Sequence, residues 1–190
     1  RINGVMKGES AELLQETYVP YEALPKLLDP PHGYLFNTNN TPFNSAHKAD
    51  NLQESDFTDF QFGFKESENN RSARFMQLME SKKSLNMQDF FSIKYDIQYP
   101  DSLWTPSGAN IVFKTAKNSY ANYNKYKQVF DLIQGWDKRA DTTSIGAAQW
   151  AIYYNRFLGL GGKGLSLEER MDKALKATDK HLMKYFGRYD

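Results

Sequence analysis

The segment PPHGYLFNTNNTP, residues 30–42, carries the strongest local signals in the chain. Its two prolines and Gly33 predict a turn, and the apolar residues 34–36 predict a short strand that the polar run from Asn37 ends. Because side chains alternate along a strand, we expect Asn37 and Asn39 to share one face. The segment therefore predicts a turn, a strand and a cluster of side-chain amides at the end of the strand.

The chain on either side of this segment has few signals of regular structure. Prolines interrupt residues 1–30, where residues 10–14 have the pattern of a short helix. Residues 43–70 are polar with little periodicity, which predicts a long loop with room for short helical turns. We divide the chain into an extended segment that ends in the asparagine-motif strand (1–42), a loop (43–70) and a helical region (71–190), which together form a single partial domain.

From residue 71 onward, apolar residues recur at helical spacing. Residues 145–158 are apolar on nearly all sides, which predicts a helix buried among several neighbours. Ser166 and Glu169 have capping-box spacing and predict the start of a last helix. The predicted core faces are Phe75, Leu78 and Met79; Phe90, Ile93 and Ile97; Tyr126, Val129, Phe130, Ile133 and Trp136; and Met171, Ala174, Leu175, Leu182, Tyr185 and Phe186. The sequence thus predicts an α+β fold that is mainly α, with few short strands and several helices.

The composition argues against several classes of function. A chain of 190 residues that is 40% hydrophobic, with a mean hydropathy of -0.70, fits one domain with a core and no membrane span. The formal net charge of +1 gives no overall field that would attract nucleic acid or an anionic membrane. The absence of cysteine excludes disulfides and thiol chemistry from this chain. We therefore expect neither nucleic acid nor a membrane as partner.

Two motifs that suggest ligand binding have simpler interpretations. GLGGKG at residues 159–164 matches the dinucleotide-binding pattern, but a helix precedes it where that motif needs a strand, so we interpret it as a helix–helix connector. The three histidines, His32, His47 and His181, are far apart and have no His or Cys neighbours at the spacing of metal ligands. We interpret them as solvated side chains rather than a zinc site.

The asparagine cluster allows two interpretations from the residues alone. Asn tolerates left-handed backbone and caps turns with its side chain, so the cluster can simply end a strand. A side-chain amide held rigidly at a strand end is also a good neutral donor to a developing oxyanion, as in acyl transfer. Chemistry alone leaves both open.

The same segment resembles a signature in the β-subunit of penicillin acylases and acyl-homoserine-lactone acylases. That signature reads Pro-x-x-Gly, an aromatic or aliphatic residue, and then Asn-x-Asn-[Asn/Asp]-x-Pro. Further resemblances cover most of residues 15–160 in order: Arg71 with the apolar helix after it, SLNMQDF at 84–90 with Tyr95 and Asp96, LIQGWD at 132–137 and SIGAA at 144–148.

This resemblance implies an N-terminal nucleophile hydrolase of αββα architecture, of which the chain would be a fragment. In that family a precursor cleaves itself to expose a Ser, Cys or Thr, whose free α-amino group acts as base when the nucleophile attacks an amide carbonyl. The resemblance implies that Asn39 donates a hydrogen bond to the oxyanion and that Arg71 organises the nucleophile's amino group and the substrate. We add Asn37 and its aromatic neighbour Phe36 as candidate contacts to the substrate, an N-acylated small molecule.

The resemblance also bears on metal ions, substrate and location. No cofactor is required for this chemistry, but several family members bind calcium, and Asp50, eleven residues after Asn39, lies close to where one carboxylate ligand occurs. The ending of residues 39–43, NNTPF, looks slightly more like the acyl-homoserine-lactone acylases than the aryl-acyl penicillin type. Family members are usually periplasmic or secreted.

One departure from the family limits what the chain does alone. Residue 1 is Arg, which cannot be the nucleophile, and no self-cleavage site with a following Ser, Cys or Thr stands ahead of the asparagine motif. We therefore expect part of a β-subunit, with the remaining α- and β-subunit segments as partners, that is inactive by itself. Two alternatives from other classes stay open: a non-catalytic homologue that binds an acyl or amide ligand, and a helical interaction module in which the asparagines are only turn residues.

Overall fold

The computed structural model describes residues 18–57 and 69–189. The chain divides into two compact units, residues 1–72 and residues 73–190. The short helix predicted at residues 10–14 lies outside the described residues. The assignment of the whole chain to a single partial domain, with boundaries after residues 42 and 70, stays a prediction.

Where the first unit is described, residues 18–57 form loops and short 3-10 helices. The one backbone bridge among these residues is antiparallel, between Leu35 and Ala46, and beside it the Phe36 N–H donates to the Ser45 carbonyl at 2.8 Å. The predicted loop 43–70 carries short helical turns where it is described. The 3-10 helices of the unit are η2 (Tyr21–Ala23), η3 (Pro42–Asn44) and η4 (Glu54–Phe57).

The strand predicted at residues 34–36 is wrong in extent, because only Leu35 is paired. A strand ladder needs backbone N–H and C=O groups that are available for pairing on successive residues. Beyond Phe36, backbone N–H groups bond to side chains instead. The N–H groups of Thr38 and Asn39 bond to asparagine side chains in a turn. Asn39 also has a φ of 60°, so the alternation that would place it on one face with Asn37 does not apply.

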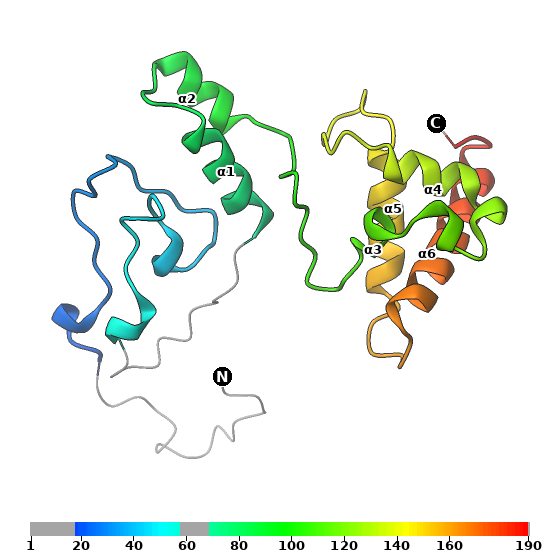
Figure 1. Cartoon of the computed structure of the whole chain (residues 1–190), viewed down its shortest axis with the longest axis horizontal. Helices are drawn as coiled ribbons and strands as arrows, with labels where there is room; N and C mark the ends of the chain where they lie inside the picture. The colour runs from blue at the N-terminus through cyan, green and yellow to red at the C-terminus, as the bar shows by residue number, and fades with distance from the viewer. Residues whose placement is uncertain (1–17, 58–68, 190) are drawn as a thin grey trace. The chain divides into compact units, whose positions relative to one another are not determined.

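The second unit is helical, as predicted. Its α5 and α6 run side by side, with α4 against both (Figure 1). Apart from the two isolated bridges, Leu35–Ala46 and Gln98–Arg139, the described residues contain no β-structure. The helices are α1 (Asn70–Glu80, whose first turn belongs to the first unit), α2 (Met87–Lys94), α3 (Ile111–Lys114), η5 (Lys117–Ser119), η6 (Tyr123–Lys125), α4 (Lys127–Gln134), α5 (Ala147–Leu158) and α6 (Leu167–Tyr185).

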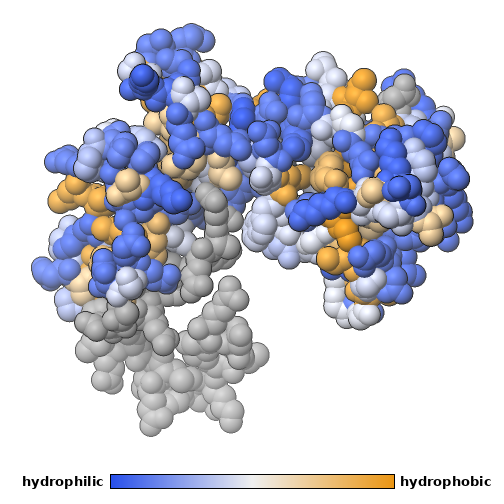
Figure 2. Space-filling model, in the orientation of Figure 1, coloured by the Kyte–Doolittle hydropathy of each residue, from blue (hydrophilic) through white to orange (hydrophobic). Residues whose placement is uncertain are grey.

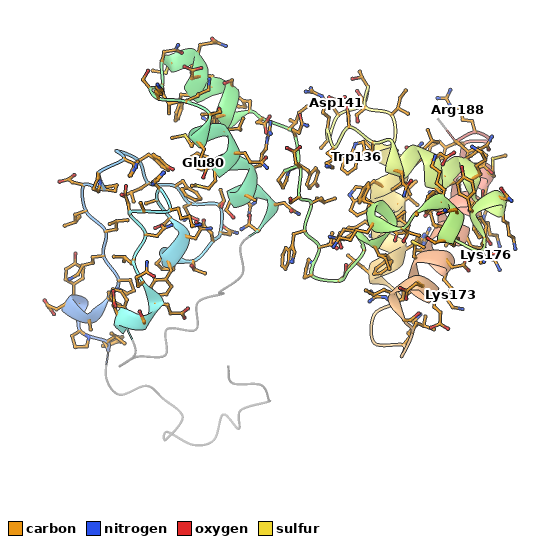
Figure 3. All side chains as sticks on the ribbon, viewed as in Figure 1. Glu80, Trp136, Asp141, Lys173, Lys176 and Arg188 are labelled. Carbon is orange, nitrogen blue, oxygen red and sulfur yellow. The ribbon has the colours of Figure 1, made fainter. Side chains whose placement is uncertain are left out.

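The core of the second unit lies between α3, α4, α5 and α6. Trp136 and Trp150 stack at its edge with ring centroids 5.8 Å apart. The indole N–H of Trp136 donates to the Arg139 carbonyl at 2.9 Å and to Ser144 Oγ at 3.0 Å, which fixes the loop between α4 and α5 (Figure 3). The largest fully buried side chains of this unit are those of Pro100, Val112, Val129, Phe130, Ile133, Tyr153, Phe157, Met171, Leu175 and Thr178.

The predicted start of the last helix is confirmed. Ser166 Oγ accepts the Glu169 N–H, and the Glu169 carboxylate accepts the Ser166 N–H, which is a complete capping box. Residues 159–164 connect α5 to α6, as predicted. Local patterns that act through neighbouring backbone groups were therefore sufficient to locate this helix pair.

Several predicted core positions are exposed instead. Phe90 is 52% exposed and contacts the ring of Phe91 on its own helix. Tyr185 and Phe186, each 62% exposed, lie against His181 of α6 rather than against another helix. Helical spacing identifies which residues share a face, but burial requires an element that packs on that face.

The helix predicted over residues 145–158 is buried on one side only. Ile145, which precedes α5, and Leu158 at its end are exposed, as are Ala148 and Ala151. The buried face consists of Gln149, Trp150, Tyr153 and Phe157. Ala and polar residues on the opposite side of the helix face solvent. Because Ala counts as apolar, the apolar content of the segment does not distinguish this exposed face from a buried face.

The visible surface of the second unit is mostly hydrophilic, with narrow hydrophobic patches (Figure 2). Lys173 and Lys176 of α6 are both exposed (Figure 3). Among the described residues, none of the helices combines the length and the apolar character that crossing a membrane requires.

The first testable prediction concerns Gly146, which is buried with a φ of 95° at the start of α5. A Cβ there would collide with the Leu132 carbonyl oxygen and lie 2.8 Å from the Trp136 Cβ. We expect Gly146→Ala to lower the free energy of unfolding by about 2–5 kcal/mol, from backbone strain and overpacking together. Gly162 has a φ of 73° with open space around it, so Gly162→Ala should cost only about 1–2 kcal/mol. Equal losses in denaturant titrations would contradict the close contact.

The second prediction concerns Asp131, which pairs with Lys117 at 2.8 Å and Lys127 at 2.6 Å and accepts from the Tyr123 hydroxyl. Partial burial raises the pKa of this carboxyl, but its partners outweigh that effect and lower the pKa from 3.8 to about 2. The resulting stabilisation is present above pH 3.8 and is lost as the pH falls toward 2. We expect the stability difference between wild type and Asp131→Asn to close over that range in denaturant titrations. A stability difference that stays constant between pH 3.8 and 2 would contradict these pairs as its source.

Candidate functional site

Residues 37–40 form a turn that is held by two asparagine side chains. Asn37 Oδ1 accepts the Asn39 N–H at 2.9 Å. Asn40 Oδ1 accepts both the N–H of Thr38 at 2.7 Å and its hydroxyl at 3.0 Å. Asn39 sits between them with left-handed backbone, which Asn adopts more readily than most residues. The turn geometry of the first interpretation is therefore present.

In the same turn, two side-chain NH₂ groups, those of Asn39 and Asn40, have no hydrogen-bond partner among the described residues. The Asn39 side chain is exposed and makes no hydrogen bond to the residues that the structure describes. Asn40 Nδ2 is buried and has no hydrogen-bond partner among them. A buried N–H donor without a partner is costly, so such groups are uncommon and usually have a specific role. The turn thus combines a fixed backbone with two unused amide donors.

Asn69 connects this turn to the start of α1. Its Oδ1 accepts the N–H groups of Arg71 at 3.0 Å and Ser72 at 3.1 Å, so it is the N-cap of the helix. The buried Ser72 hydroxyl lies within hydrogen-bond distance of the Asn69 N–H and carbonyl. The other end of the Asn69 amide, Nδ2, donates to the Thr38 carbonyl at 3.0 Å. One side chain therefore holds both the helix start and the backbone beside Asn39.

Arg71 occupies the first turn of α1, so the capping by Asn69 brings it to the same part of the unit as the asparagine turn. Its side chain is exposed and has no ion pair with a described carboxylate. A positive charge at a helix N-terminus is not favoured by the helix dipole.

The two candidate substrate contacts are placed differently. Phe36 is partly buried and holds the chain through its N–H bond to the Ser45 carbonyl. Asn37 is exposed, with its Oδ1 engaged in the turn. Whether either residue contacts a substrate stays a prediction.

The structure brings together two histidines that lie far apart in the sequence. The rings of His32 and His47 stack with centroids 3.5 Å apart and an angle of 14° between their planes. His32 also donates its N–H to Asp50 Oδ2 at 2.9 Å, and its Nδ1 lies 2.8 Å from Asp50 Oδ1. The third histidine, His181, is elsewhere, beside Arg156 in the second unit.

Asp50 is the buried member of this cluster, with a side chain that is only 4% exposed. Burial raises the pKa of its carboxyl, but the hydrogen bonds from His32 and the charges of His32 and His47 outweigh it and hold the pKa below the ordinary value. Calcium prefers six to eight oxygen ligands. The described neighbours of Asp50 include ring nitrogens, and whether Asp50 binds calcium stays a prediction.

Sequence reasoning missed Asn69 and the histidine pair. A signal for Asn69 was present, since Asn at 69 and Ser at 72 have the spacing of an N-cap and its reciprocal partner. The histidine pair had no local signal, because the turn at residues 30–33 and the bridge of Leu35 to Ala46 bring the two rings together. The spacing of residues along the sequence does not reveal which distant residues pair.

Comparison with known proteins gives one result. Residues 3–185 match the family described as Penicillin amidase. No curated protein and no solved structure shows a significant match.

The third prediction separates the two functions of Asn69. Asn69→Asp keeps an oxygen that caps α1 but removes the Nδ2 donor to the Thr38 carbonyl. We therefore expect α1 to keep its amide protection, whereas the N–H groups of Thr38 and Asn39 exchange with solvent faster, as measured by hydrogen exchange with NMR detection. Asn69→Ala should also lose about 1 kcal/mol of helix stabilisation. Unchanged exchange at the turn in both variants would show that Asn69 does not hold it.

Proposed function

Since the chain belongs to the penicillin amidase family, we propose that it supplies the oxyanion-binding part of an amidohydrolase that cleaves an N-acyl amide by acyl transfer to water. The family supports an acylase role for the protein. The proposal adds which residues of this chain take part and how.

The proposed reaction has two steps. A Ser, Cys or Thr nucleophile, from a segment outside residues 1–190, adds to the amide carbonyl with its own α-amino group as base. The carbonyl oxygen becomes an oxyanion, the C–N bond breaks, and the amine leaves with the proton. Water then attacks the acyl-enzyme, which releases the carboxylic acid and restores the nucleophile. Both steps pass through a negative charge on the same oxygen, so a donor placed there accelerates both.

Asn39 is the proposed donor to that oxygen. The observation that carries the proposal is that its amide is exposed and has no hydrogen-bond partner among the described residues. Its backbone is fixed by the Asn37 side chain, and the neighbouring Thr38 is held by Asn40 and Asn69. A donor on a fixed backbone needs little reorganisation when the charge develops, which is how oxyanion sites gain their effect. The amide is also neutral, so it favours the transition state without binding a charged ground state strongly.

Arg71 is the proposed positioning residue. Its side chain carries a positive charge with no described ion-pair partner, at a helix start that Asn69 ties to the asparagine turn. In this role it orients the nucleophile's amino group and the substrate. Asn37 and Phe36 are the proposed substrate contacts.

The substrate class follows from the family and remains broad. We propose an N-acylated small molecule, with an acyl-homoserine lactone or a penicillin as the two types to compare. The chain would act as part of a β-subunit together with the remaining segments of the acylase, in the periplasm or outside the cell.

The fourth prediction tests Asn39 in the processed full-length protein. Asn39→Gly removes the amide but keeps the left-handed backbone without strain, since Gly adopts a φ of 60° readily. We expect kcat to fall on the order of 100-fold or more, with self-processing intact. Deacylation of N-acyl substrates, followed by amine release, measures this loss.

Asn155→Ala is the matched control, because Asn155 is an exposed asparagine on α5 in the other unit. It should leave kcat unchanged. If Asn39→Gly retains full turnover, the asparagines are turn residues only. If the full-length protein binds N-acyl compounds but turns none over, the non-catalytic binding homologue is the better description.

A further inference from the structure

The cluster of His32, His47 and Asp50 is separate from the proposed catalytic residues, and its two imidazoles and one carboxylate are potential metal ligands. One ligand atom from each of the three side chains lies within 4.8 Å of the other two. Among the residues that the structure describes, no other group of three His, Asp or Glu side chains meets this criterion. We propose that His32, His47 and Asp50 bind a divalent transition-metal ion of the zinc class.

The donor chemistry selects the type of ion. Two imidazole nitrogens and one carboxylate are a common set for zinc and its neighbours in the first transition row, which bind three protein ligands and leave a position for water. Calcium and magnesium prefer oxygen ligands and gain little from imidazole. The site therefore differs from the calcium site that the family resemblance suggested for Asp50.

The backbone already holds the anionic ligand in place. Asp50 Oδ2 accepts the His32 N–H at 2.9 Å, and the Asp50 N–H donates to the His47 carbonyl at 2.8 Å. The turn of His32 is closed by the Gly33 N–H, which donates to the Pro30 carbonyl at 2.8 Å. All three ligands therefore come from two short loops whose ends are fixed to each other.

The ligand atoms need only modest movement to meet one ion. His32 Nδ1 and Asp50 Oδ1 are 2.8 Å apart, whereas tetrahedral zinc with bonds of about 2.0–2.2 Å separates its ligands by roughly 3.4 Å. The ion thus takes the place of the hydrogen between these atoms, with a small opening of the pair.

His47 must make a larger change. A metal ion lies in the plane of the imidazole that binds it, so two nearly parallel stacked rings cannot both bind one ion as they stand. Among the described residues, one hydrogen bond restrains the His47 ring, from the Ala49 N–H to Nδ1 at 3.2 Å. Binding exchanges the ring stack and this bond for metal–nitrogen bonds, and it joins the loop at residues 30–33 to residues 47–50.

The fifth prediction is tested with zinc itself. The 190-residue chain, without a polyhistidine tag, is titrated with Zn²⁺ and separately with Ca²⁺ at neutral pH, with equilibrium dialysis to count bound ions. We expect one Zn²⁺ per chain, not displaced by Ca²⁺, and a blue colour from tetrahedral coordination when Co²⁺ replaces it. Absence of zinc binding, or displacement by calcium, would overturn the proposal.

Asparagine variants keep the local hydrogen bonds but lack an imidazole. His47→Asn retains an acceptor for the Ala49 N–H, and His32→Asn retains a donor to Asp50. Each should weaken Zn²⁺ binding at least about tenfold, whereas His181→Asn, in the other unit, should leave it unchanged. Circular dichroism and amide exchange establish that the variants fold, and the two histidine variants serve as independent tests if one does not. If both variants bind Zn²⁺ as tightly as the wild type, or if His181→Asn loses binding, the ion binds elsewhere. Because Asn39 is not a ligand, this outcome is independent of the turnover of Asn39→Gly.

Discussion

The two ends of the Asn69 side chain determine the geometry of the candidate site. The amide oxygen satisfies two N–H groups at the start of α1, and the amide nitrogen satisfies the Thr38 carbonyl. Among the described residues, these three backbone groups have no other hydrogen-bond partner. A donor at the asparagine turn and a cation at the helix start therefore depend on one planar group, which cannot rotate to improve one contact without losing the other.

This dependence explains how a largely irregular segment can hold a defined turn. The described residues of the first unit contain a single bridge and short 3-10 helices, so a regular ladder does not position Asn39. Side-chain amides perform that function instead, with Asn37, Asn40 and Asn69 each accepting or donating to backbone groups within the turn. Such bonds compete with a strand, and here they replace it after Leu35. The turn interpretation and the donor interpretation of the asparagines are compatible. The bonds that fix the turn would also orient the side-chain amide of Asn39.

The sequence was informative wherever structure depends on neighbours along the chain. The capping box at Ser166, the connector at residues 159–164 and the mainly helical class follow from spacing and backbone chemistry. It was uninformative where structure depends on what packs against a face. Phe90 and Tyr185 share helical faces with apolar residues yet are exposed, because apolar spacing does not specify a partner. The approach of His32 to His47 depends on a pairing between residues eleven positions apart, Leu35 with Ala46, that no motif marks.

The distribution of tryptophan gives the two units different optical properties. All three tryptophans, Trp104, Trp136 and Trp150, belong to the second unit, where the latter two stack against each other in the core. All intrinsic tryptophan emission therefore comes from the second unit, and the unit that carries the asparagine turn and the histidine pair contains no tryptophan. An unchanged emission spectrum consequently does not establish that the asparagine turn is intact.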